Sequence, residues 1–324
     1  MTGKPAHICV LLNTAASGFQ DRPVREICDV ISSIFATRGI GAGIHLVFGG
    51  LLEKRAKQEI AAGGIDAIVV GGGDGTVGSV AGALTSTGIP FGILPLGRVN
   101  HFARDLGIPA KLDQAVEVIA RGHTTLVDTG EINGRVFVNN SSLGAYPFLV
   151  LDRERRRRRR GVQRPIALLL AGLKLLRMFP LRRVSVRVEN WSEVCRTPCL
   201  FVGNNQYQLE LFALGRRPKL SAGELWIYIA RQQTRLSLVW FTFKCLLGMT
   251  DPATDLRMLH GASAEIGAEG RRLEVALDGE VVRMRAPLHY RIRPASLRVY
   301  VEAPLTPTTN ADDRAHFRPS LWKP

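Results

Sequence analysis

Apolar and polar residues follow two different patterns along the chain. In roughly the first 120 residues, short runs rich in isoleucine, valine and leucine alternate with segments whose apolar residues recur every three or four positions. The runs at 8–12, 65–70 and 91–94 have the length of strands, and the segment 24–35 has helical spacing. This alternation predicts an α/β domain with a parallel sheet and helices on both of its faces.

After about residue 124 the pattern changes to short alternating runs that are separated by turn residues. These runs lie at 136–138, 184–188, 225–229, 273–277 and 281–284. They predict an antiparallel β-sandwich as the second domain. One helix of about four turns is expected at 165–179, and the polar, proline-containing tail 306–324 is expected to be loose.

Composition sets the broad class of protein. Hydrophobic residues make up 46% of the 324 residues, which supports a sizeable core. No apolar run approaches the roughly 20 residues that a membrane-spanning helix needs, and no signal-peptide pattern is visible. The five cysteines include no CxxC pair, so neither a disulfide framework nor a zinc site is expected. We therefore expect a cytoplasmic protein.

The net charge of +15 favours an acidic partner, and the basic residues are most concentrated in the block 153–160, which holds seven arginines. Such a run is typical either of a solvated loop or of a surface that contacts anionic lipid, where each basic residue contributes about 1 kcal/mol. Nucleic acid is not expected, because no aromatic residues interleave with the arginines. The residues predicted to face a membrane surface are Arg155, Arg156, Arg157, Arg158, Arg159 and Arg160.

The glycine-rich turn 71–76 joins a predicted strand to a helix predicted at 77–84. Unpaired N–H groups and the positive end of the helix dipole favour a phosphate at such a place, and glycines let the backbone approach it closely. Asp74 is suited to orienting a Mg²⁺-bound water, and Thr76 can donate its hydroxyl to a phosphate. A tight connection without a ligand would use the same residues, so the turn alone leaves both interpretations open.

A second polar stretch, 95–109, follows the neighbouring predicted strand. It would face the same crevice at the carboxyl ends of the strands, where open α/β sheets bind their ligands. Asn100 is placed either to cap the next helix or to bind a nucleotide. His101 is more typical of an exposed surface histidine than of a catalyst.

Several motifs in a fixed order resemble the diacylglycerol kinase catalytic-domain family, especially its soluble bacterial lipid kinases, a family related to the sphingosine kinases. The motifs are the loop 13–18, Gly-Gly-Asp-Gly-Thr at 72–76, the stretch 95–109, Val-Asp-Thr-Gly at 127–130, the stretch 137–144, Gly-Asn-Asn at 203–205 and Asp-Gly-Glu at 278–280. The resemblance runs from about residue 7 to about residue 302.

The resemblance implies that Mg·ATP lies between an N-terminal nucleotide domain and a β-sandwich that receives the lipid. It implies an ATP-binding domain at 1–128, to which 292–305 return, and an acceptor domain at 129–291. The cofactors expected are ATP and Mg²⁺, with Asp74 linked to the metal through water. The residues implied to bind ATP are Asn13, Gly72, Gly73, Asp74, Gly75, Thr76, Gly97, Arg98 and Asn100.

The resemblance also implies that Asp278 and Glu280 lie near the reacting hydroxyl. The residues themselves show an alternating strand pattern that ends in Asp278-Gly279, which is a two-residue hairpin signal, so an ordinary turn is the plainer interpretation. Phosphoryl transfer to an alcohol needs a carboxylate that accepts the hydroxyl proton. Asp278 is the candidate base, with Glu280 assisting it or holding Mg²⁺, and a hairpin turn is compatible with both roles.

Three positions depart from the family pattern. Arg98 stands where a threonine is usual, which would exchange a hydroxyl–phosphate contact for a charge-assisted one. His101 stands where many members have an aspartate. Residues 221–223, Ser-Ala-Gly, occupy the place of an acidic pair that holds a structural metal in other members, and no such metal is predicted here.

The leading hypothesis is a kinase that transfers the ATP γ-phosphate to a hydroxyl of diacylglycerol or a related lipid at the membrane surface. One alternative is a kinase of the same superfamily with a soluble acceptor such as NAD, which the glycine turn alone does not exclude. The other is a nucleotide- or membrane-binding regulator that has lost catalysis, which the three departures motivate. The sequence predicts neither the acceptor lipid nor the oligomeric state.

Overall fold

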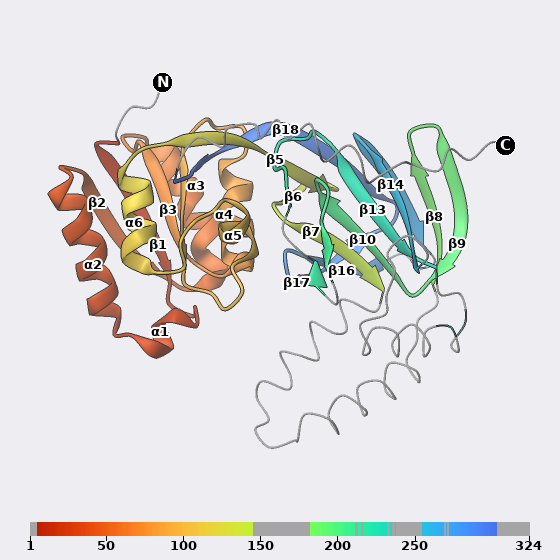
Figure 1. Cartoon of the computed structure of the whole chain (residues 1–324), viewed down its shortest axis with the longest axis horizontal. Helices are drawn as coiled ribbons and strands as arrows, with labels where there is room; N and C mark the ends of the chain where they lie inside the picture. Colours follow the sequence, from red (N-terminus) through yellow and green to blue (C-terminus); the bar gives the residue numbers. More distant parts are fainter. Residues whose placement is uncertain are drawn as a thin grey trace, which may run out of the picture.

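The computed structural model describes residues 5–144, 182–210, 213–214, 217–231, 234, 237, 255–268, 270 and 272–302. These residues form two domains that lie side by side and are joined by two long strands (Figure 1). The arginine block, the helix predicted at 165–179 and the predicted tail lie outside the described residues. No helix within the described ranges is both long and apolar enough to cross a membrane.

The N-terminal domain is a parallel sheet with helices on both faces. Its strands, in the spatial order β2-β1-β3-β4, are β1 (His7–Asn13), β2 (Gly41–Val47), β3 (Ala67–Gly72) and β4 (Phe91–Pro95). Its helices are α1 (Gly18–Asp21), α2 (Val24–Thr37), the 3₁₀ turn η1 (Gly49–Leu51), α3 (Leu52–Ala62), α4 (Asp74–Leu84), α5 (His101–Asp105) and α6 (Leu112–Ala120). Helix α2 packs beside α6, and α3 packs beside α4 (Figure 1).

Burial explains the apolar patterns of this domain. Every residue of β3 is buried, because helices cover both faces of the sheet at this strand. In α2 the buried residues Ile27, Ile31 and Phe35 recur at helical spacing, so one face of the helix packs on the sheet while the other meets solvent.

The C-terminal domain is a β-sandwich. One sheet has the antiparallel order β14-β13-β10-β7-β16-β17, with β7 (Asn140–Gly144), β10 (Cys199–Asn204), β13 (Leu225–Ala230), β14 (Leu256–Gly261), β16 (Arg272–Leu277) and β17 (Glu280–Arg285). The facing strands are β8 (Arg182–Val188), β9 (Trp191–Thr197) and β15 (Ser263–Ala268). Three short strands complete it: β6 (Arg135–Phe137), β11 (Leu209–Glu210) and β12 (Ala213–Leu214).

The two sheets of the sandwich share one apolar core. In β8, Val184, Val186 and Val188 are buried while the residues between them are exposed, which is the alternation of a strand with one covered face. Val202 and Val275, on the opposite sheet, belong to the same core. The predicted fold class, an α/β domain followed by an antiparallel sandwich, is confirmed.

Two antiparallel strands, β5 (Thr124–Ile132) and β18 (Leu288–Tyr300), run through both domains (Figure 1). One end of β18 pairs with β15 in the sandwich, and Val299 near its other end pairs with Phe91 of β4. The parallel sheet of the N-terminal domain therefore continues through β18 into the sandwich domain. The domain limits predicted at 128 and 292 both lie inside these strands.

The two strands β5 and β18 form the joint between the domains, and Asp128 stabilises the irregular middle of their pairing. The pairing of β5 with β18 shifts register between Arg293 and Leu297. Asp128, which is 2% exposed, accepts a hydrogen bond from the N–H of Ala295 at 2.8 Å and another from the N–H of Gly223 at 2.7 Å. One buried carboxylate therefore satisfies backbone groups from two segments that the regular ladder cannot pair.

We expect Asp128→Ala to lower the free energy of unfolding by about 2–3 kcal/mol, because it leaves two backbone donors without their charged acceptor. Urea denaturation followed by circular dichroism would measure the change. Asp113→Ala, at an exposed position on α6, is the control and should change the free energy by less than about 0.5 kcal/mol. Equal losses in the two variants would contradict a role of Asp128 at the joint.

Candidate functional site

The glycine turn forms the first turn of α4. The helix begins at Asp74, three residues before the predicted start, so Gly75 and Thr76 are helical rather than part of a loop. Gly73 takes the N-cap position, and no side chain in the described part of the chain caps the helix. The first N–H groups of a helix have no intrahelical partner, and here they also lack a side-chain acceptor. This end of α4 is therefore suited to an anion.

The loop after β4 lies against this turn. A Cβ at Gly97 would lie only 2.4 Å from the Cα of Gly73, so the two backbones touch in a way that a side chain would prevent. Asn100, in the left-handed region with φ 53°, fixes the loop: its Oδ1 accepts from the N–H of Gly97 at 3.0 Å, and its Nδ2 donates to the carbonyls of Gly97 and Pro95. Asn100 thus organises the backbone of its own loop.

Asn13 reaches the same place from the end of β1. Its Nδ2 donates to Oγ1 of Thr76 at 2.7 Å, and its Oδ1 accepts from the N–H of Ala15 at 3.0 Å. Both side chains are largely buried. Because Thr76 Oγ1 accepts this bond, its own O–H hydrogen can be donated to another group.

Asp74 connects the turn to α5. Its Oδ1 accepts from the N–H of Phe102 at 3.1 Å, in the first turn of α5. His101 begins that helix and is partly exposed, and Arg98 is exposed in the preceding loop. The structure thus brings the glycine turn, Asn13, Gly97 and Asn100 together and places Arg98 at the outside of the same loop.

Asp278 comes from the sandwich domain and is held by backbone N–H groups. Its Oδ2 accepts from Val138 at 2.8 Å, and its Oδ1 accepts from Asn139 at 2.8 Å and Asn140 at 3.1 Å. Asp278 and Gly279 have φ values of 46° and 88°, so the predicted hairpin turn between β16 and β17 is confirmed. The carboxylate is buried at the head of this hairpin.

Two opposing effects set the pKa of Asp278. Burial raises the pKa of this carboxyl to about 6, and the charge of Asp74 acts in the same direction. The three backbone N–H donors lower it, but not enough to offset burial. Asp278 is therefore a carboxylate near neutral pH with an unusually high proton affinity, which is the property expected of a group that accepts a proton.

The hairpin of Asp278 presses on the glycine-lined face of α4. A Cβ at Gly75 would lie 2.6 Å from Oε1 of Glu280, and a Cβ at Gly78 would lie 2.6 Å from Oδ2 of Asp278. Any larger residue at either position would push the hairpin away from the helix. The glycines therefore let two acids of one domain reach the first two turns of a helix in the other.

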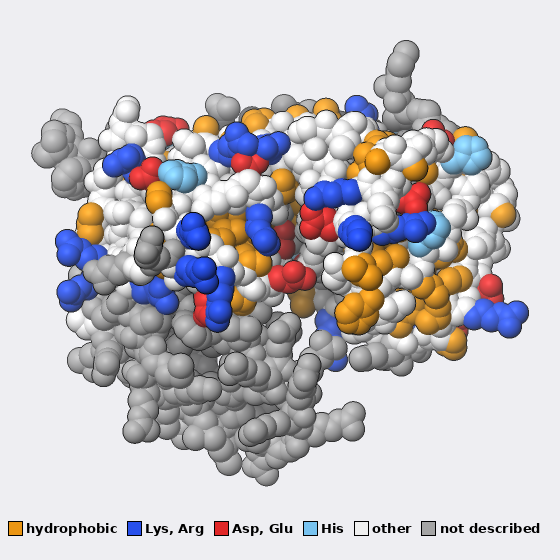
Figure 2. Space-filling model, turned by 180° about the vertical axis from the view of Figure 1, so that it is seen from behind, with side chains coloured by type: hydrophobic (Ala, Val, Ile, Leu, Met, Phe, Trp, Pro, Cys, Tyr) orange, Lys and Arg blue, Asp and Glu red, His pale blue; other side chains and the backbone are white. Residues whose placement is uncertain are grey.

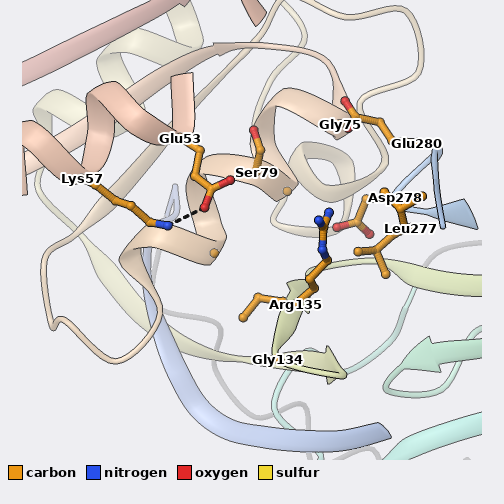
Figure 3. Close-up of a pocket in the computed structure, with 13 residues that line it drawn as sticks. Glu53, Lys57, Gly75, Ser79, Gly134, Arg135, Leu277, Asp278 and Glu280 are labelled. Carbon is orange, nitrogen blue, oxygen red and sulfur yellow. Dashed lines mark hydrogen bonds and ion pairs between the residues drawn. The ribbon is translucent and has the colours of Figure 1, made fainter. Parts of the chain in front are cut away.

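A pocket of about 360 Å³ opens beside these acids, between the two domains (Figure 3). Helix α4 contributes Gly75, Gly78, Ser79 and Gly82, and α3 contributes Glu53 and Lys57. The sandwich domain contributes Gly134, Arg135, Val136, Leu277, Asp278, Glu280 and Val282. The sequence did not identify Glu53, Lys57 or Arg135 as site residues.

Arg217 lies beside the site and was not predicted from the sequence. Its side chain is fully buried between the domains, and its Nε donates to Oδ2 of Asp105, at the end of α5, at 2.7 Å. The guanidinium also donates to the carbonyl of Val138 at 2.6 Å and to Oδ1 of Asn139 at 3.0 Å. It therefore holds the same segment whose N–H groups hold Asp278.

One aromatic ring from each domain packs against the guanidinium of Arg217. Its central carbon lies 5.6 Å from the ring centre of Phe102 in α5 and 5.5 Å from that of Tyr207 in the sandwich domain. Such contacts stabilise a cation that has lost its water. The basic stretch around 217 gave no local signal for this role, because its partner Asp105 is 112 residues away.

In the segment 221–223, two backbone N–H groups donate hydrogen bonds to side-chain oxygens. The N–H of Ala222 donates to Oδ1 of Asn205 at 3.2 Å, and the N–H of Gly223 donates to Asp128. In the described part of the chain, Cys9, His45 and Glu59 are close enough together to hold a metal ion. Arg55 already pairs with Glu59 at 2.6 Å, so a cation fits poorly there.

Fold and site together define a two-domain protein in which the N-terminus of α4, without a side-chain cap in the described residues, faces acids from a β-sandwich. Residues 7–132, from β1 to β5, match the family model described as the diacylglycerol kinase catalytic domain. The predicted resemblance to that family is confirmed. The match covers the domain that carries Asn13, the glycine turn and Asn100, whereas Asp278 and Glu280 lie beyond it.

Relatives and solved structures extend the likeness over more of the chain. A Citrobacter koseri protein named "Probable lipid kinase YegS-like" is 23% identical over 299 residues, covering 91% of this chain and 95% of the relative. The diacylglycerol kinase of Staphylococcus epidermidis is 32% identical over 126 residues, which cover 38% of this chain and 39% of the relative. The chain spans only part of two further relatives: 57% of the length of a Synechocystis protein and 47% of the length of a Yersinia enterocolitica protein.

A crystal structure of a diacylglycerol kinase from Bacillus anthracis str. Sterne superimposes with a TM-score of 0.68 at 19% identity. The alignment covers 92% of this chain and 98% of that one. At this level of identity the likeness shows that the two proteins share a fold.

We expect Arg217→Ala to lower the free energy of unfolding by about 3–5 kcal/mol, because Asp105, with a side chain only 5% exposed, would keep a buried charge without its partner. Chemical denaturation would measure the loss. The matched control is Arg38→Ala, which breaks an exposed ion pair with Glu117 and should cost less than about 1 kcal/mol. If Arg217→Ala combined with Asp105→Ala cost as much as the sum of the single changes, the pair would not be coupled.

Proposed function

We propose that the protein is an ATP-dependent lipid kinase that transfers the γ-phosphate to a hydroxyl of diacylglycerol or a related lipid. The observation that carries the proposal is the contact between the Asp278 hairpin and the first turns of α4. It brings a buried carboxylate with raised pKa to a helix terminus suited to phosphate. The family match of residues 7–132 and the names of the relatives support the same chemistry.

The residues around the glycine turn fit a nucleotide triphosphate. The uncapped N–H groups of α4 and the backbone at Gly72–Gly73 would hold phosphate oxygens, and the hydroxyl of Thr76, oriented by Asn13, would donate to another. Gly97 and Asn100 shape the wall on the other side. Arg98, exposed in the same loop, would supply a positive charge to the phosphates where the family has a hydroxyl.

Carboxylates for Mg²⁺ are present on both sides of the joint. Asp74 in the N-terminal domain and Glu280 in the sandwich domain flank the first turn of α4, and magnesium prefers oxygen ligands together with several waters. We assign Asp74 a metal contact through water. A bound Mg²⁺ would neutralise charge on the phosphates during transfer.

Asp278 is the proposed general base. Its backbone donors fix the carboxylate in one orientation, and burial keeps its proton affinity high enough to take the proton of an acceptor hydroxyl as the oxygen attacks phosphorus. Glu280, two residues further along the hairpin, assists by facing the helix turn where the phosphate would lie. The hairpin thus presents one acid to the acceptor and one to the nucleotide.

A lipid acceptor requires the enzyme to work at a membrane surface. The charge of +15 and the arginines at 155–160 support an electrostatic contact with anionic lipid. We therefore propose peripheral association with the membrane.

Transfer of labelled γ-phosphate to a panel of lipids in mixed micelles tests the function directly. We expect at least one hydroxyl-bearing lipid to be phosphorylated and Asp74→Ala to bind ATP more weakly than the wild type. NAD, as a soluble acceptor, provides the comparison. Phosphorylation of NAD but of no lipid would favour the soluble-acceptor alternative, and no transfer together with unchanged ATP binding by Asp74→Ala would refute both.

We expect Gly97→Ala to weaken ATP binding by about tenfold to a hundredfold, because the new methyl group would separate the loop after β4 from the glycine turn. Titration with a fluorescent ATP analogue would measure the dissociation constant, with a melting curve to verify folding. Gly50→Ala is the control, since nothing lies within 4 Å of a Cβ at that position. A folded Gly97→Ala protein with wild-type affinity would show that the contact does not shape the nucleotide site.

The pKa of Asp278 predicts the acid side of the pH profile. A base must be ionised, so kcat/KM should fall as the pH drops through about 6, where the folded protein protonates Asp278. Asp278→Asn should lower kcat by about 10²- to 10⁴-fold and remove this limb. Rates at saturating Mg·ATP from pH 5 to 8 would show it. If Asp278→Asn kept the limb, Asp278 would not be the base.

A further inference from the structure

Three large apolar side chains are exposed on the N-terminal domain at the end of β2. Phe48 is 67% exposed, Leu51 57% and Leu46 51%. Of the six large hydrophobic side chains that are exposed in the described part of the chain, three therefore fall within this one segment of six residues. Scattered apolar side chains are normal on a surface, whereas a group of them marks a place of contact.

The core holds the backbone of this segment in place. Val47 packs against the core of the N-terminal domain, and Leu52, the first residue of α3, is fully buried. The carbonyl of Val47 accepts from the N–H of Thr14 at 3.0 Å. The N–H of Leu51 donates to the carbonyl of Phe48 at 2.8 Å, which closes the 3₁₀ turn η1. The exposed side chains therefore project from a loop that other residues anchor.

The loop adjoins both the glycine turn and the pocket between the domains. A Cβ at Gly49 would lie 3.3 Å from Nδ2 of Asn13, which donates to Thr76 in the first turn of α4. Helix α3 begins directly after the loop and contributes Glu53 and Lys57 to the pocket. The apolar side chains thus stand beside the pocket that an acceptor from a bilayer would enter.

The charge around the loop suits an anionic surface. Lys54, in the first turn of α3, is exposed, and no acid within the described ranges pairs with it. Because β1 and β2 are parallel, α2 begins at the edge of the sheet where β2 ends, and Arg22 shortly before it is exposed. In the view from behind, hydrophobic side chains gather on the N-terminal domain with lysine and arginine side chains next to them (Figure 2). Surfaces that bind negatively charged bilayers have this composition.

The size of the apolar group favours a bilayer over a protein partner. A large apolar side chain presents on the order of 200 Å², so three that are half to two-thirds exposed present roughly 350 Å². A standard protein interface buries about 800 Å² on each partner, which is more than twice this area. Insertion into a bilayer needs no matching surface, because the hydrophobic effect is not directional and acyl chains close around a protruding side chain.

We propose that Leu46, Phe48 and Leu51 insert into an anionic bilayer and hold the pocket between the domains against its surface. This inference rests on the proposed lipid kinase function and adds to it the face of the protein that meets the membrane. Lys54 and Arg22 strengthen the contact through the lipid head groups. Unlike the electrostatic contact proposed for 155–160, apolar insertion persists at high salt.

Sedimentation with vesicles in the absence of ATP tests the surface apart from catalysis. The vesicles contain equal parts of phosphatidylcholine and phosphatidylserine. We expect a triple variant with Leu46→Gln, Phe48→Gln and Leu51→Gln to bind about tenfold to a hundredfold more weakly at low and at high salt. Lys54→Gln should weaken binding about fivefold, and at low salt alone. The matched control is Leu126→Gln, at a leucine of β5 that is 42% exposed, and it should bind like the wild type.

A kinase assay with the same variants separates docking from catalysis. With diacylglycerol in these vesicles, the triple variant should lose activity in proportion to its loss of binding. With a short-chain diacylglycerol dissolved below its critical micelle concentration, its kcat/KM and its KM for ATP should stay within about twofold of the wild type. A melting curve for each variant verifies that the protein is folded.

Several outcomes would overturn the inference. No vesicle binding by the wild type, undiminished binding by the folded triple variant, or an equal loss in Leu126→Gln would each show that the loop does not insert. A higher KM for ATP would assign Phe48 to the nucleotide, and a wild-type dimer that the triple variant converts to a monomer would assign the loop to a second copy. Vesicle binding that the triple variant loses, without phosphorylation of any lipid by the wild type, would refute the proposed function and support the docking surface.

Discussion

The buried guanidinium of Arg217 holds the two halves of the site in one arrangement. It pairs with Asp105 at the end of α5, and the N–H of Phe102 in the first turn of the same helix donates to Asp74 in the glycine turn. On the other side it binds the segment 138–139, which donates to Asp278. A fully desolvated cation tolerates little change in the position of its partners, because each lost bond leaves a buried charge or carbonyl unsatisfied. The N-terminal end of α4 and the carboxylate of Asp278 are thereby linked through one side chain.

Glycine residues meet the second requirement of the site, which is close contact between the Asp278 hairpin and α4. Asp278 and Glu280 reach α4 only because Gly75 and Gly78 offer backbone where other residues would offer side chains. The same glycines lower the intrinsic stability of the helix by about 1 kcal/mol each relative to alanine. The packing of the hairpin and of β3 must offset this cost, which explains why α4 extends to Asp74 although its composition predicts a start at 77.

Local signals allowed much of the fold and part of the site to be predicted. The strand–glycine turn–helix unit and the Asp278-Gly279 hairpin are each encoded within a few residues, so both local structures could be predicted without the structure. Arg217 could not be found in this way, since its meaning comes from Asp105, 112 residues distant. The place of Arg135 in the pocket likewise depends on the packing of the two domains, although the hairpin turn at Asn133-Gly134 before it is encoded locally. The roles of these residues in binding and catalysis remain predictions.

The continuity of the joint bears on how such a site would work. Many kinases assemble their site by closing two domains around a hinge. Here β5 and β18 pair with each other through both domains, and Asp128 pins their irregular middle to Gly223. A hinge at this place would have to break strand pairing, the Asp128 bonds and the buried Arg217 contacts together. The arrangement therefore favours a preorganised site, in which the acids that line the pocket are already in place before a ligand enters it.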